Sequence, residues 1–301
     1  MNPQKRRSPG AVFAISFSIS LAVLLAVVMT VMSVILRPRE TGGTAGAEKT
    51  AEAVRYEPGE ADALSLLVIS CRRRSDSPDA FTLIRFDPAN ERLLLISIPP
   101  ETVTTVGAKT GTFRKHYEYA GSENARLAAE SLFLCRVGGY IRIAKSGAVN
   151  LIDALGGLEC RFSSGYENEQ VSVPPGEHLL SGELLYEIAS APPEGQEAES
   201  WRAGLYRDFL QQRLGKALIP RLDYLMESFW NNTDTDLSVF DWNARRRAAE
   251  AFLSAEGKAV EVRSLPGVWN GERTLFTADE AAVLEFRALL GAEEPEKEKG
   301  G

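Results

Sequence analysis

The chain of 301 residues carries 34 basic and 41 acidic residues, two His and three Cys, and its formal net charge is −7. Hydrophobic residues make up 44% and charged residues 25%, a composition that excludes a wholly disordered or fibrous chain. The acidic balance argues against nucleic acid as a partner, and so few His and Cys argue against a rich metal cluster.

A membrane-spanning helix is predicted at residues 11–36. This run contains no charged residue and no proline, and about 20 apolar residues are enough for a helix to cross a bilayer. A cleaved signal peptide is the alternative, but its apolar region would span only about 7–15 residues. Because the run is longer and is followed directly by Arg37 and Arg39, an uncleaved anchor is favoured.

The flanking charges predict how the anchor is oriented. Lys5, Arg6 and Arg7 precede it, so the positive-inside rule makes residues 1–10 a cytoplasmic tail. The rest of the chain then lies outside the cell. It comprises a flexible stalk at 37–61, a folded domain at 62–290 and a disordered charged tail at 291–301. We therefore expect a single-pass protein of the cell membrane with an extracytoplasmic domain.

The folded domain opens with three predicted strands. The continuous apolar run at 64–69 is typical of a buried central strand. Strands at 80–86 and 92–98 follow, and the sequence Asp-Pro-Ala-Asn at 87–90 predicts a turn between them. Together the three segments predict a hairpin beside the first strand.

Helical and strand-like segments then alternate to the end of the domain. This order predicts the α/β class, with a mixed central sheet covered by helices on both faces. Ser122, Asp241 and Thr277 are the expected helix caps. The predicted helices are 122–133, 147–155, 181–188, 201–218, 222–230, 237–253 and 278–290, and the predicted strands are 140–143, 159–162, 260–265 and 268–269.

Seven short segments between residues 64 and 218 form an ordered set of motifs. They are LLVISCRRR at 66–74, DAFTLIRFDP at 79–88, LLLISIPPET at 93–102, YEYAG at 117–121, VNLIDALGG at 149–157, PGEHLLSGELLY at 175–186 and RDFLQQ at 207–212. In this order, behind a membrane segment, they resemble the motifs of the LytR–CpsA–Psr (LCP) family of bacterial envelope proteins.

The resemblance implies an α/β/α domain that transfers a glycopolymer from polyprenyl pyrophosphate to a peptidoglycan hydroxyl. The implied partners are a polyprenyl-pyrophosphate-linked glycopolymer or another cell-wall polymer. Arginines suit this chemistry because guanidinium groups hold phosphate oxygens in pairs. Carboxylates would bind Mg²⁺, the implied cofactor, or activate the acceptor hydroxyl.

Matching the motifs residue by residue leaves a depleted active site. Arg74, Arg207 and Gln211 match positions implied to bind substrate, and Asp79 matches a catalytic carboxylate. Arg72 stands where the family has a metal-binding aspartate, which weakens the case for Mg²⁺, and no other metal site is predicted. The positions where the family has other arginines hold Ser77, Pro100, Ile188, Ser190 and Leu210.

Two functions therefore remain open. One is a weak or altered glycopolymer phosphotransferase, in which the cluster Arg72, Arg73 and Arg74 compensates for the lost arginines. The other is a catalytically inactive scaffold or wall-polymer-binding protein, in which that cluster is only a solvated charge run. Transcriptional regulation is disfavoured, because the outer domain is acidic and has no helix-turn-helix signal.

Among the other polar candidates, His116 is expected at the surface and His178 in a loop. Neither is near a serine or cysteine motif that would give it a catalytic partner. Cys71 and Cys135 lie in apolar surroundings and are expected to be buried thiols. The sequence leaves open whether either of them, or Cys160, forms a disulfide.

The predicted topology can be tested with a reporter enzyme fused after Gly301. A reporter that works only outside the cytoplasm should be active in intact cells, because the anchor would place the carboxyl end of the chain outside. A fusion to a reporter that works only in the cytoplasm is the control and should be silent. Cytoplasmic activity would contradict the orientation.

Overall fold

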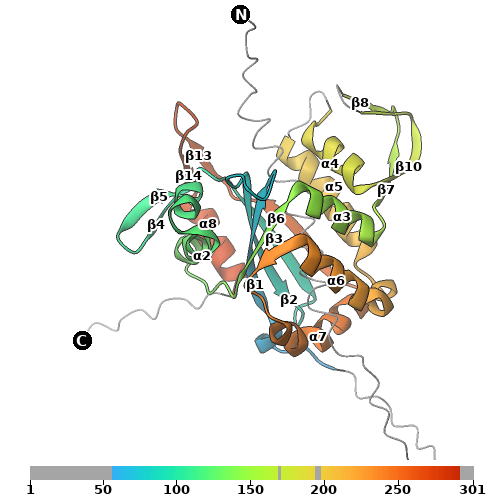
Figure 1. Cartoon of the computed structure of the whole chain (residues 1–301), viewed down its shortest axis with the longest axis horizontal. Helices are drawn as coiled ribbons and strands as arrows, with labels where there is room; N and C mark the ends of the chain where they lie inside the picture. Colours follow the sequence, from blue (N-terminus) through green and yellow to red (C-terminus); the bar gives the residue numbers. More distant parts are fainter. Residues whose placement is uncertain (1–55, 169–170, 194–197, 292–301) are drawn as a thin grey trace, which may run out of the picture.

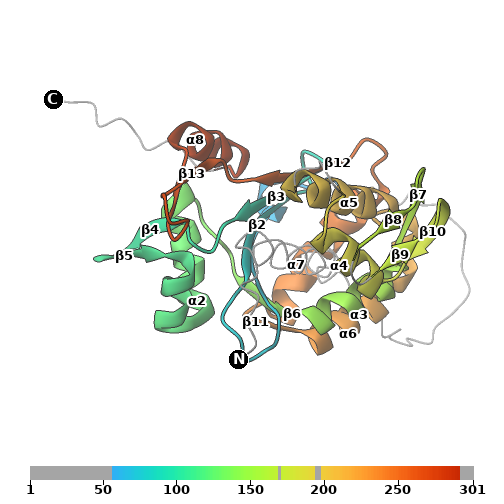
Figure 2. The same cartoon turned by 90° about the horizontal axis from the view of Figure 1, so that it is seen from above.

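The fold is described from a computed structural model, which describes residues 56–168, 171–193 and 198–291. A six-stranded sheet runs through the middle of the domain, and helices cover both of its faces (Figures 1 and 2). In spatial order the strands are β11 (Thr233–Thr235), β6 (Tyr140–Ala144), β1 (Leu64–Cys71), β2 (Ala80–Asp87), β3 (Arg92–Ile98) and β12 (Ala259–Ser264). The predicted α/β class with a mixed, doubly covered sheet is confirmed.

The sheet mixes two kinds of pairing. β2 and β3 form the predicted hairpin, and β1 pairs antiparallel with β2. β1 also pairs with β6, and β3 with β12, in parallel. Every residue of β1 is buried, because the strand has helices on both faces. Its side chains alternate between two cores, so that Leu66 and Val68 pack on one side and Leu67 and Ile69 on the other.

The two helical layers differ in size. Helices α2 (Phe113–Phe133) and α8 (Glu280–Leu289) cover one face (Figure 2). The other face carries α3 (Lys145–Leu155), α4 (Gly182–Ser190), α5 (Ala198–Arg213), α6 (Leu222–Asn232) and α7 (Val239–Ser254). Small two-stranded antiparallel sheets pair β4 (Val103–Val106) with β5 (Lys109–Thr112), β7 (Leu158–Phe162) with β10 (Gly176–Leu180), β8 (Tyr166–Glu167) with β9 (Ser172–Val173), and β13 (Gly267–Trp269) with β14 (Phe276–Ala278).

Several predicted helix boundaries are wrong, and local hydrogen bonds explain them. Helix α2 begins nine residues before Ser122, because Thr112 caps it by accepting a bond from the Lys115 amide, 3.2 Å away. The helix then kinks at Gly121, where φ is +74°. The part of α2 after this kink matches the predicted helix at 122–133, and the part before it, from Phe113, was not predicted.

Two other caps are displaced by a few residues. Helix α7 is capped by Ser238, and Asp241 is the reciprocal member of the capping box. Helix α8 is capped by Asp279 and not by Thr277. Helix α5 ends at Arg213, and the rest of the expected helix belongs to a 3₁₀ helix, η2 (Lys216–Arg221).

The predicted membrane helix at 11–36 lies outside the described residues, as do most of the stalk and the tail. Within the described ranges, no helix is long and apolar enough to cross a membrane.

The packing of α7 on the sheet predicts a large stability difference between two phenylalanines of that helix. Phe252 is fully buried and its ring lies 5.3 Å from that of Phe86 on β2, centroid to centroid. Phe252→Ala should lower the free energy of unfolding by about 3–5 kcal/mol, measured by denaturant titration. Phe240, on the same helix but 82% exposed, is the control, and Phe240→Ala should cost less than about 0.5 kcal/mol. Equal losses would contradict this packing.

Candidate functional site

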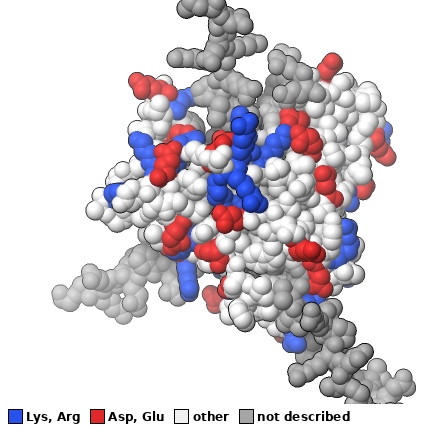
Figure 3. Space-filling view, viewed as in Figure 1, with Lys and Arg blue, Asp and Glu red and all other residues white. Residues whose placement is uncertain are grey.

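The carboxyl ends of two neighbouring parallel strands meet at one edge of the sheet. Cys71, the last residue of β1, is in register with Ala144, the last residue of β6. Arg72 and Lys145 follow directly, so two cations stand side by side where open α/β sheets bind ligands. Figure 3 shows Lys and Arg side chains gathered at the centre of this face, over the ends of β1 and β6.

We call this region the β1 site and define it by Arg72, Asp79, Arg114, Lys145 and Tyr186. These residues come from four parts of the chain: the end of β1, the start of β2, the first turn of α2, and the α3–α4 pair. Asp79 was expected in the site, and Arg72 was considered as part of a compensating basic cluster. The other three were not singled out from the sequence.

Asp79 is the half-buried carboxylate of the site. Its amide donates to the Ser70 carbonyl at 2.8 Å, which extends the β1–β2 ladder, and its carboxylate is hydrogen-bonded to the Arg72 backbone N–H. The Oδ2 atom is buried and has no hydrogen-bond partner among the residues that the structure describes. Burial raises the pKa of Asp79, although the charges of Arg72 and Arg114 oppose the shift. The carboxylate therefore keeps an open acceptor position.

Arg114 reaches the site from the start of α2. Its guanidinium donates to the Pro78 carbonyl at 2.8 Å and to the Glu101 carboxylate at 2.9 Å. Glu101 thus fixes this arginine beside Asp79. The kinked early start of α2 brings Arg114 here, which is why a helix beginning at Ser122 did not predict it.

Lys145 and Tyr186 form the other wall. The Lys145 ammonium lies 2.7 Å from Glu183, 2.8 Å from Glu187 and 4.1 Å from the centroid of the Tyr186 ring. Burial disfavours its charge, but the bonds to the two carboxylates outweigh burial and raise its pKa. Burial also raises the pKa of Tyr186, so its hydroxyl remains a hydrogen-bond donor. The position of Lys145 directly after a strand was the sequence signal that could have identified it.

The other expected substrate-binding residues lie elsewhere. The Arg74 guanidinium is exposed and 3.5 Å from the Asn231 carbonyl at the end of α6. Arg207 is on the solvent-facing side of α5 and pairs with its neighbour Asp208 at 3.5 Å. Gln211, one turn further along, is exposed as well. The structure therefore brings Arg72 to Asp79 but directs Arg207 to solvent.

Two positions where the family has arginines belong to the hydrophobic core. Ile188 and Leu210 are both fully buried and pack in the same cluster as Tyr186. A guanidinium there would need buried polar partners to offset its desolvation. Ser190 donates from its hydroxyl to the Tyr186 carbonyl at 2.7 Å, and Ser77 donates to Glu118 at 2.9 Å. These positions therefore serve packing or local hydrogen bonding.

The side chains around Asp79 are not a suitable set of ligands for Mg²⁺. This ion requires near-octahedral oxygen ligands and is usually held by one or two carboxylates. The charged side chains that act most strongly on Asp79 are the cations Arg72 and Arg114, and Glu101 is already bound to Arg114. Across the described ranges, no group of three or more His, Cys, Asp or Glu side chains could hold a metal ion. The residues around Asp79 therefore do not form a Mg²⁺ site.

The remaining candidates are structural. His116 is buried, contrary to expectation, because the early start of α2 places it in the helix, where its Nε2 lies 3.2 Å from the Thr104 carbonyl. Cys71, Cys135 and Cys160 are free thiols. Burial raises the pKa of Cys135 to about 11, so its thiolate is scarce at neutral pH.

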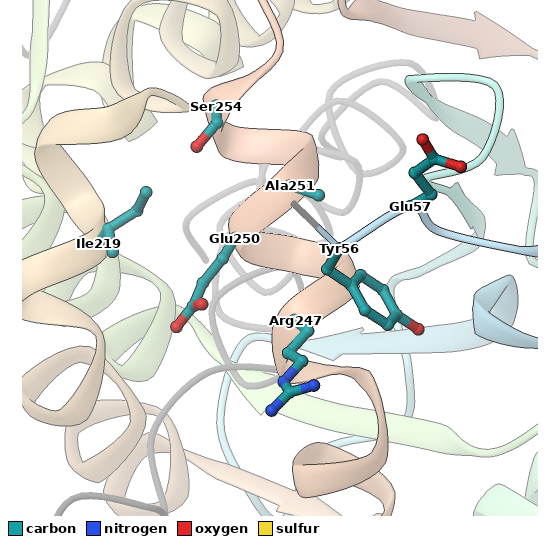
Figure 4. Close-up of a pocket in the computed structure, with 7 residues that line it drawn as sticks. All are labelled: Tyr56, Glu57, Ile219, Arg247, Glu250, Ala251 and Ser254. Atoms are coloured by element: carbon teal, nitrogen blue, oxygen red, sulfur yellow. The ribbon is translucent and has the colours of Figure 1, made fainter. Parts of the chain in front are cut away.

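A cavity of the domain lies away from the β1 site. It has a volume of about 900 Å³, and Figure 4 shows its lining residues: Tyr56, Glu57, Ile219, Arg247, Glu250, Ala251 and Ser254. Tyr56 and Glu57 precede the amino end of β1, so the cavity is at the opposite end of that strand from Arg72. It contains none of the residues that the motif matches indicate.

The fold and the site together define a class of protein: an α/β/α domain that carries cations and a carboxylate at the ends of its parallel strands. The model of the LytR–CpsA–Psr family matches residues 34–290. The chain therefore belongs to the LytR–CpsA–Psr family.

Relatives and solved structures agree with this assignment. The polyisoprenyl-teichoic acid–peptidoglycan teichoic acid transferase TagU of Oceanobacillus iheyensis is 20% identical over 195 residues, which are 60% of this chain and 61% of the relative. A crystal structure from Eubacterium siraeum, 20% identical, superposes with a TM-score of 0.69 over 84% of this chain and all of its own. Bacillus subtilis TagV, 18% identical, superposes with a TM-score of 0.61 over 76% of this chain and 95% of its own.

The raised pKa of Asp79 predicts a specific pH dependence of stability. The folded state holds the Asp79 proton more tightly than the unfolded state, so this residue should destabilise the fold as pH rises above the ordinary value of 3.8. Asp79→Asn removes the titrating group. Its stability relative to wild type should therefore increase between about pH 3 and pH 7 in denaturant titrations. Ser77→Ala is the control without a titrating group, and a pH-independent difference for Asp79→Asn would refute the shift.

Proposed function

We propose that this chain binds the pyrophosphate of a polyprenyl-linked glycopolymer at the β1 site and transfers the polymer to peptidoglycan. The observation that carries the proposal is the meeting of Arg72, Arg114 and Lys145 with Asp79 at the carboxyl ends of β1 and β6. Membership of the family supports it, as does the transferase activity named for TagU and TagV. The matched region covers less than two thirds of these relatives, so substrate and acceptor are part of the proposal.

The proposed reaction is a phosphoryl transfer. A peptidoglycan sugar hydroxyl attacks the phosphorus next to the glycopolymer, the phosphoanhydride bond breaks, and polyprenyl phosphate leaves. Asp79 accepts the hydroxyl proton, and its raised pKa suits a general base. Arg72 and Arg114 stabilise the negative charge that develops on the phosphates.

The proposal places the domain outside the cell, held by the apolar segment at residues 11–36. A polyprenyl carrier lies in the membrane, and the uncharged run at the start of the chain would hold the domain near the membrane surface. The stalk at 37–61 would supply the reach between membrane and domain.

A second candidate function is a catalytically inactive scaffold or wall-polymer-binding protein with the same fold. Two structural observations favour it. Ile188 and Leu210 are fully buried where the family has arginines. In addition, Lys145 is neutralised by Glu183 and Glu187, which lowers the positive charge available to a pyrophosphate.

Binding and turnover together separate the two candidates. The full chain in detergent is titrated with farnesyl pyrophosphate, and wild type should bind at micromolar concentration. Lys145→Ala should weaken binding by about tenfold, because the Glu183 and Glu187 carboxylates lose their cation and then repel the pyrophosphate. Arg161→Ala is the matched control, since Arg161 is an exposed cation on β7, away from the β1 site. Absence of binding at millimolar ligand would contradict the proposed function.

Turnover is then measured with a lipid-linked glycopolymer and peptidoglycan. A transferase should release polyprenyl phosphate, and Asp79→Asn should slow release by about 10²–10⁴-fold, the usual contribution of a general base, while binding persists. Binding without any release in the wild type would support the scaffold instead.

A further inference from the structure

Arg72 occupies an unusual position among the cations of the β1 site. It is the first residue after β1, and its own backbone N–H is hydrogen-bonded to the Asp79 carboxylate. Its side chain is exposed, yet it is close enough to act electrostatically on both Asp79 and Tyr186. Arg72 is therefore an exposed cation close to a carboxylate that has one oxygen without a hydrogen-bond partner among the described residues.

The neighbouring cations are already neutralised. Arg114 pairs with Glu101 at 2.9 Å. Lys145 bridges two glutamates. Arg142, on β6, lies 3.9 Å from Asp234 and also donates to the Arg74 carbonyl.

By contrast, Arg72 forms no ion pair of this kind with any residue that the structure describes. Its charge acts at longer range on the Asp79 carboxylate. It is therefore the cation of the site with the most charge left for a ligand.

The same arrangement disfavours a divalent cation. A metal ion bound to the open Oδ2 of Asp79 would sit next to the permanent charge of Arg72 and would be repelled by it. The nearby Glu101 carboxylate is held by Arg114, and the charge of Asp76, which also acts on Asp79, is a weaker influence than those of Arg72 and Arg114. A guanidinium, in turn, can do for a phosphate what a metal does, since its planar N–H groups bind two oxygens at once.

We infer that Arg72 takes the place of a divalent cation in the β1 site, so that phosphate groups are bound there without a metal. The Arg72 side chain is exposed and acts electrostatically on Asp79, whose backbone is held by the β1–β2 ladder. This inference rests on the proposed function, and it specifies how that site recognises its anionic group.

The first test measures binding of farnesyl pyrophosphate to the full chain in detergent, in EDTA and in excess Mg²⁺. Affinity in EDTA should equal that in Mg²⁺. Arg72→Gln should weaken binding by about tenfold or more in both buffers, because one charge-assisted contact is lost. Arg73→Gln, an equally exposed neighbour, is the matched control and should change affinity little.

The second test reverses the charge. Arg72→Asp places a second carboxylate beside Asp79, so binding in EDTA should be lost and Mg²⁺ should restore it. Thermal melting of each variant confirms folding, and the exposed position of Arg72 makes unfolding unexpected.

The outcomes separate the inference from the proposed function. Wild-type binding that requires Mg²⁺ would overturn the inference and leave the proposed function standing. Equal losses for Arg72→Gln and Arg73→Gln would overturn the assignment to Arg72. No binding in either buffer would overturn the proposed function itself.

Discussion

The parallel pairing of β1 with β6 is the constraint on which the rest of the structure depends. Because β1 is buried along its whole length between two helical layers, its carboxyl end cannot move relative to β2 and β6. That rigidity places Arg72 beside Asp79 on one side and beside the start of α3 on the other. The site is thus built at the end of the best-packed strand, from side chains whose backbones are held by the sheet ladder.

Acidic residues within the site offset much of the positive charge of its cations. A net charge of −7 leaves acidic residues in excess, and some of that excess stands inside the site, where Glu101, Glu183 and Glu187 are bound to its cations. Each such pair lowers the charge available to a phosphate while fixing the geometry of its partner. The site therefore differs from a simple basic cluster, and its one exposed and unneutralised arginine, Arg72, takes on more importance.

Much of the fold could be predicted from local signals. Residues close together in the sequence were enough to predict the apolar strands β1, β2 and β3 and the turn after β2. They also predicted that α3 ends at Gly156. The start of α2 could not be predicted in the same way, because Ser122 follows a kink inside the helix, whereas Thr112, also a residue type that caps helices, lies just before its first residue. The site was harder to predict than the fold, because Arg114 and Lys145 are held in it by carboxylates that are 13 and 42 residues away along the chain.

The sequence by itself determined the α/β class, the ordered motifs that resemble the family, and the loss of arginines at five motif positions. It did so because strand alternation, turn residues and motif spacing are local properties. Only the tertiary structure decided which charges meet. It buried Ile188 and Leu210 in the core, turned Arg207 to solvent, and paired Arg114 and Lys145 with carboxylates. The charge that a ligand meets depends on burial and on partners that are distant in sequence, and these exist only after the sheet and its two layers have assembled.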